Sequence, residues 1–70
     1  MTRAEARWTA RYRVAFEHIA LARPGWTRQL AEEWAAELAP QAWAAGQARE
    51  PTVVAARDVV ATEAEWATLY

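Results

Sequence analysis

The sequence contains no cysteine, and it also lacks lysine, serine and asparagine. Without cysteine there are no disulfides, thiolate metal ligands or thiol nucleophiles, and a reducing compartment is favoured. Without serine the chain has no hydroxyl of the kind used by the common hydrolase triads. No apolar run reaches the roughly 18 residues that a membrane span needs, and the first residues lack the apolar stretch of a signal peptide. We therefore expect a cytoplasmic protein that is not an enzyme.

The sequence has little that breaks a helix and much that forms one. Two glycines and three prolines occur in 70 residues, which leaves no glycine-rich phosphate loop. Alanine is abundant and favours helix. All eight basic residues are arginine, a usage that is typical of a GC-rich bacterial genome. A chain of this length supports one domain, residues 1–70, whose small core gains from any partner. Its five tryptophans are expected to supply much of that core.

The hydrophobic spacing predicts an all-α bundle of three main helices and one short helix. Thr2 followed by Glu5 is a capping box, which predicts a first helix that runs to about residue 22. Thr27 is a suitable N-cap for a second helix. Pro40 is tolerated best in a first turn, so it predicts a separate short helix over residues 40–45. A last helix is expected from about residue 52, after Pro51.

Apolar residues recur three and four positions apart in each predicted helix, which indicates one buried stripe per helix. In the last helix this stripe would contain Val53 and Val60. The predicted tryptophan-rich core consists of Trp8, Tyr12, Phe16, Ile19, Leu30, Trp34, Leu38, Val53, Val60 and Trp66.

The side chains that could carry chemistry are few. His18 is the only histidine, and it lies on the side of the first helix away from Trp8, where a surface role is expected. Glu33 and Glu37 are one helical turn apart and could share a divalent ion, but no further ligand is close in sequence. We expect both to be solvated, and the sequence predicts no catalytic residue, metal or cofactor.

Charge is divided unevenly along the chain. Residues 1–28 hold six arginines and two glutamates, whereas residues 29–70 hold two arginines and seven acids, giving net charges of +4 and −5. Arg3, Arg7 and Arg11 form a basic stripe on the first helix opposite its core stripe, and Val14 and Leu21 lie on the same outer face. This face could meet water and acids of the same chain, another protein, or the phosphates of a nucleic acid.

Arginine together with aliphatic side chains is typical of protein interfaces. We therefore predict a protein-interaction module, a homodimer being one form of it, that binds through Arg7, Arg11, Val14 and Leu21. The alternative is a nucleic-acid-associated protein that uses the arginine stripe. That alternative is weakened by the net charge of −1 and by a poor match to a helix-turn-helix, because Pro40 falls where a recognition helix would form.

Overall fold

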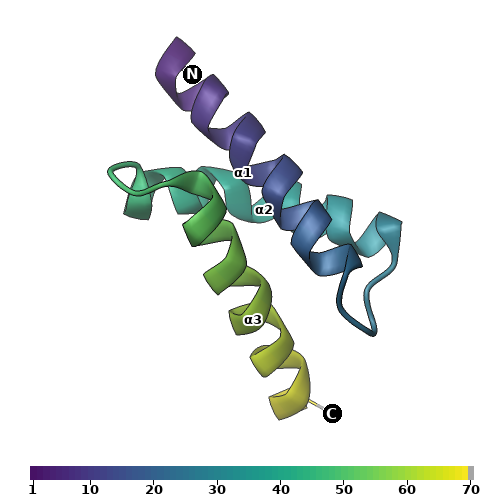
Figure 1. The fold of residues 1–70 in the computed structure, drawn as a ribbon. Helices are drawn as coiled ribbons and strands as arrows, with labels where there is room; N and C mark the ends of the chain where they lie inside the picture. The colour runs from purple at the N-terminus through teal and green to yellow at the C-terminus, as the bar shows by residue number, and fades with distance from the viewer. Residues whose placement is uncertain (70) are drawn as a thin grey trace.

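The computed structural model describes residues 1–69, and this part of the chain forms three helices. They are α1 (Arg3–Leu21), α2 (Arg28–Gly46) and α3 (Pro51–Leu69). In Figure 1, α1 crosses α2, and the start of α1 and the end of α3 lie at opposite ends of an elongated molecule of 37 × 21 × 17 Å. The prediction of an all-α fold is confirmed.

Both predicted N-caps form. The Thr2 hydroxyl accepts a hydrogen bond from the Glu5 amide at 3.1 Å, and the Thr27 hydroxyl accepts one from the Leu30 amide at 3.1 Å. Each bond satisfies an amide that has no partner inside its helix. Between these helices Gly25 takes a φ of +92°, a conformation that glycine adopts without strain and that ends the corner after α1.

The predicted fourth helix is wrong, because α2 runs unbroken through Pro40 to Gly46. Pro40 lacks the amide hydrogen that would bond to the Ala36 carbonyl, one turn earlier. Both residues are exposed, so water can satisfy that carbonyl. A proline on the solvent side of a well-packed helix therefore does not divide it.

A chain of six aromatic rings runs through the core. Trp8 contacts Tyr12 and Trp43 with ring centroids 5.6 and 5.8 Å apart. Phe16 continues the chain from Tyr12 to Trp26, and Trp26 contacts Trp66 of α3 at 4.5 Å. These separations lie in the usual range for favourable aromatic pairs. The aromatic side chains of α1 thus connect it to both other helices.

Small residues of α2 face these rings. The buried stripe of α2 consists of Ala31, Ala35, Ala39, Ala42 and Gly46, of which Gly46 faces Val54 of α3. Leu30, Trp34 and Leu38 lie beside that stripe and are only partly buried. The large side chains of α1 fill the space between the helices, so α2 must present small ones.

The predicted core is otherwise correct for Trp8, Tyr12 and Phe16, which are buried, while Ile19 and Trp66 pack against the core from its edge. It is wrong for α3, where Val53 and Val60 are 61% and 52% exposed. Val54 and Val59 are buried in their place. The actual buried face of α3 is rotated from the predicted one, toward the side that packs on α1.

Candidate interaction surface

The outer face of α1 carries the residues predicted to bind a partner. Because Trp8, Tyr12 and Phe16 point into the core, the positions on the opposite side of the helix face solvent. Arg7 is exposed, Val14 is 71% exposed and Leu21 is 37% exposed. The predicted surface is therefore accessible on the folded chain.

Arg11 is not free on this face. Its guanidinium forms an ion pair with the Glu50 carboxylate in the connection before α3. Both side chains are more than half exposed, so the pair contributes little to stability in water. Its effect is to fix the direction of Arg11 beside the start of α3.

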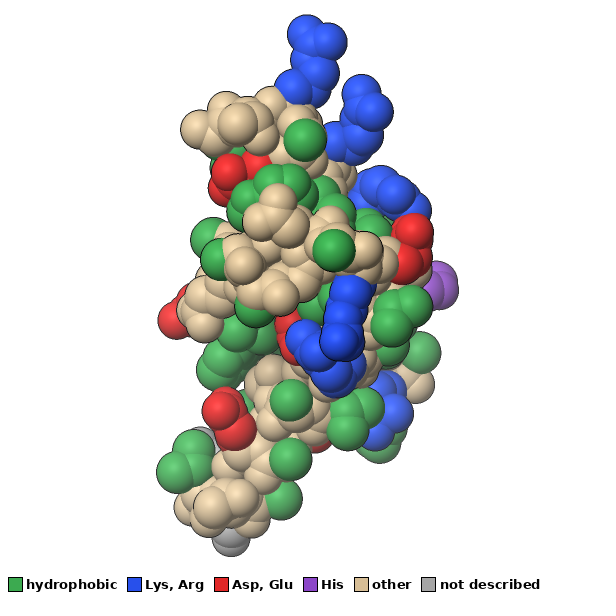
Figure 2. Space-filling model, turned by 90° about the vertical axis from the view of Figure 1, so that its left-hand side faces the viewer, with side chains coloured by type: hydrophobic (Ala, Val, Ile, Leu, Met, Phe, Trp, Pro, Cys, Tyr) green, Lys and Arg blue, Asp and Glu red, His purple; other side chains and the backbone are tan. Residues whose placement is uncertain are grey.

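Two of the four predicted site residues line one shallow hollow of about 600 Å³ on α1. Ala10, Val14, Ala15 and Ile19 give it an apolar floor, and its rim holds Arg11, His18 and Thr52 of α3. Arg7 and Leu21 lie outside this lining. Figure 2 shows hydrophobic side chains next to the histidine and arginines along the same edge of the molecule.

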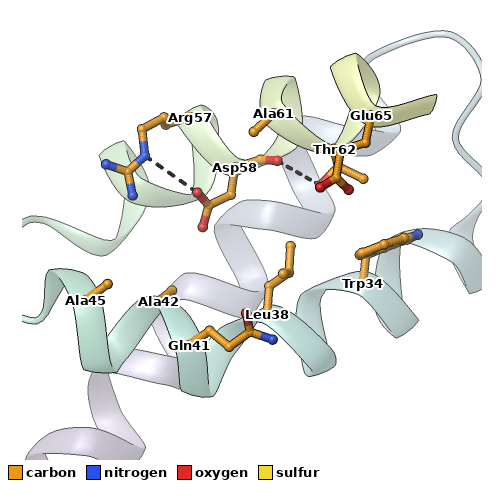
Figure 3. A pocket seen from close by; sticks show the side chains of 10 residues that line it. All are labelled: Trp34, Leu38, Gln41, Ala42, Ala45, Arg57, Asp58, Ala61, Thr62 and Glu65. Atoms are coloured by element: carbon orange, nitrogen blue, oxygen red, sulfur yellow. Dashed lines mark hydrogen bonds and ion pairs between the residues drawn. The ribbon is translucent and has the colours of Figure 1, made fainter. Parts of the chain in front are cut away.

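A second concave surface, which the sequence analysis missed, lies between α2 and α3. These helices pack on α1 far more than on each other, and the space between them is a groove of about 220 Å³ (Figure 3). Trp34, Leu38, Ala42 and Ala45 of α2 form its apolar wall. Trp34 and Leu38, which were predicted for the core, are only partly buried, and their exposed parts line this groove.

The opposite wall of the groove is polar. Arg57, Asp58 and Glu65 of α3 line it, and Glu37 is exposed on α2 one turn from Trp34 and Gln41. The Asp58 carboxylate accepts a hydrogen bond of 2.7 Å from the Tyr12 hydroxyl and lies 3.5 Å from the Arg57 Nε. The acids of this groove outnumber its single arginine.

Burial, together with the hydrogen bond to Asp58, raises the pKa of Tyr12 well above its ordinary value. The Tyr12 hydroxyl therefore stays protonated at neutral pH and donates its hydrogen bond to Asp58. This hydrogen bond joins α1 to α3 and holds Asp58 in position in the polar wall of the groove.

The three residues that were predicted to be solvated lie at the surface. His18, Glu33 and Glu37 are exposed, and within residues 1–69 no group of three or more histidine, cysteine, aspartate or glutamate side chains gathers to hold a metal. None of the three helices combines the length and apolarity required to cross a bilayer, in the part of the chain described. A further hollow of about 420 Å³ at the end of α3 is lined by Glu65, Thr68 and Leu69 of that one helix. The hollow on α1 and the groove between α2 and α3 involve more than one helix and are the surfaces that best fit a binding function.

Comparison with protein-family models, with curated proteins and with solved structures finds no match.

Proposed function

We propose that this chain is a small non-enzymatic protein-interaction module that binds another protein chain through the outer face of α1. The observation that carries the proposal is the exposure of Val14, 71%, on an apolar hollow with arginine at its rim. An exposed aliphatic side chain in a concave apolar setting gains free energy when a partner excludes water from it. Arg7 and Arg11 would then steer the partner and fix its orientation.

The nucleic-acid alternative has less support. Phosphates require cations and hydrogen-bond donors, and the hollow offers them an apolar floor. Arg11, the one arginine that lines the hollow, is paired with Glu50, and the Glu50 carboxylate beside it would repel a phosphate. A partner with apolar side chains uses both the floor and the rim.

A photo-crosslinking amino acid at Val14 tests this proposal. After irradiation of cells that express the variant, we expect adducts with a protein of discrete size on a denaturing gel. The matched control carries the same amino acid at Ala44, an exposed position of α2. Equal labelling at both positions, or adducts that only a nuclease removes, would contradict the proposal.

A further inference from the structure

The two concave surfaces differ in charge. Helix α1 carries four arginines and two glutamates, a net charge of +2. Helix α2 carries one arginine and three glutamates, and α3 one arginine and three acids, so each has a net charge of −2. The surfaces themselves show the same difference, because the outer face of α1 carries the exposed Arg3 and Arg7, whereas Asp58 and Glu65 line the groove beside a single arginine, Arg57. The two surfaces therefore differ in the sign of their charge, as electrostatic complementarity requires.

The two surfaces also complement each other in polarity. The groove has an apolar wall that includes Trp34 and Leu38, and the exposed Glu65 lines its other wall. Glu37 is exposed one helical turn from Trp34 on α2. The α1 face has an exposed aliphatic residue, Val14, with Arg7 two turns before it. An aliphatic stripe flanked by arginine is the helix surface that an apolar groove flanked by acids accepts.

The size of the groove favours side chains of a protein. Its volume of about 220 Å³ is smaller than that of small-molecule pockets, which are typically about 300–1,000 Å³. Val14 is 71% exposed, so it projects from the α1 hollow, and it is the side chain of that face that would enter the groove. The half-buried Trp34 and Leu38 would then lose most of their remaining contact with water, a gain for a domain with so small a core.

The two surfaces lie on opposite sides of the molecule. In Figure 3, α1 lies behind the gap between α2 and α3, so the groove opens away from the outer face of α1. A two-fold dimer brings one surface patch into contact with the same patch of its partner, which cannot satisfy two patches on opposite sides. Contact between these two surfaces is instead head-to-tail and can continue from copy to copy.

We propose that the partner of the α1 outer face is a second copy of this chain, which receives that face in the groove between its α2 and α3, so that copies associate head-to-tail. This inference rests on the proposed function, since it uses the same α1 face. It adds the identity of the partner and the surface of that partner that is bound.

Sedimentation velocity over a range of protein concentrations tests the inference with one variant for each surface. Val14→Glu places an acid on the α1 face, and Ala61→Arg places a bulky cation at an exposed position in the groove. We expect the unmodified chain to form species larger than two copies as concentration rises. Each variant alone should be monomeric, with association weakened by about tenfold or more.

Mixing the two variants is the decisive step. Val14→Glu retains an intact groove and Ala61→Arg retains an intact α1 face, so the mixture can form one contact and no more. We expect a complex of two copies that does not grow with concentration and that weakens as salt rises. Circular dichroism of each variant shows whether the monomeric state is folded.

Val60→Glu and Ala64→Arg are the matched controls, because both positions are exposed on α3 and neither lines the hollow or the groove. They should associate as the unmodified chain does. A mixture that stays monomeric, or an unmodified chain that is monomeric at every concentration, overturns the inference. If the unmodified chain is monomeric while Val14 still crosslinks to a different protein, the proposed function stands and only the second copy is excluded as partner.

Discussion

At the scale of single residues, polar atoms at the edge of the core connect the helices. The Tyr12 hydroxyl donates to Asp58, and the Trp8 indole nitrogen donates to the Arg49 carbonyl at 3.0 Å. The side chains of residues 1–69 leave no buried nitrogen or oxygen without a partner. A polar group at the core edge costs free energy unless it is bonded, so each of these partners is required by burial.

Replacing Tyr12 with phenylalanine tests the bond to Asp58. Loss of a hydrogen bond to a charged group should lower the free energy of unfolding by about 1–3 kcal/mol at pH 7. Folding raises the Tyr12 pKa above the ordinary tyrosine value, about 10. The stabilisation by the protonated hydroxyl is therefore complete below pH of about 10 and is lost as the pH rises further.

Urea denaturation at pH 8 and at pH 11 measures this dependence. The unmodified chain should lose stability between the two values, and Tyr12→Phe should lose less. An equal loss in both proteins would show that Tyr12 does not cause the loss of stability at alkaline pH.

At the scale of helices, the contact between α1 and α2 depends on a difference in side-chain size. The aromatic residues of α1 meet an alanine stripe, in which Ala31 and Ala35 are fully buried. The sequence pattern of α2 contains two neighbouring stripes, one of alanine and one of larger apolar residues. Periodicity alone does not decide which of them faces the partner helix, because that depends on the volume of the opposing side chains.

Ala35→Leu tests the requirement for a small residue. A leucine at this position has no space against α1, and overpacking of a filled core typically costs about 1–3 kcal/mol. Ala44→Leu is the control, since it makes the same change at an exposed position of the same helix, where the effect should stay within about 0.5 kcal/mol. Thermal denaturation of the two variants compares them directly, and equal melting temperatures would contradict the assigned buried face.

At the scale of the whole molecule, one carboxylate joins segments that are far apart in sequence. Glu63 of α3 accepts two hydrogen bonds of 2.7 Å from the Arg23 guanidinium and one of 2.9 Å from the Trp26 indole. Arg23 and Trp26 both lie in the connection between α1 and α2. This contact holds the second half of α3, where the helix extends away from α2 (Figure 1).

Glu63→Gln removes the charge and tests this contact. The hydrogen bonds from Arg23 and then Trp26 hold the Glu63 pKa below its ordinary value, so the stabilisation is present above the ordinary glutamate pKa and is lost as the pH falls below it. We expect the variant to melt below the unmodified chain at pH 7, and the difference to narrow at acidic pH, below the ordinary glutamate pKa of about 4.3. Glu32→Gln, at an exposed position, should show no such difference at either pH. A Glu63→Gln gap that persists in acid would contradict the assignment.

The local sequence pattern predicts the outer face of α1 but does not predict the groove between α2 and α3. Val14 and Arg11 could be placed on the outer face of α1 because the aromatic stripe of that helix fixes its orientation unambiguously. The groove could not be predicted, since it exists only because α2 and α3 diverge after packing on α1. The exposure of Val53 and Val60 has the same cause: a helix that is apolar on most of its surface can be buried in several rotations.

The sequence by itself determined the helical class, the two threonine caps and the orientation of α1, because these depend on neighbours within one turn of helix. It also determined the opposite charges of the two parts of the chain. Only the tertiary structure decided that α2 continues through Pro40, which face of α3 is buried, and that a groove lies opposite the outer face of α1. These features depend on the volumes of side chains from different helices and on access of water to particular backbone groups, and neither quantity is set by residues adjacent in the chain.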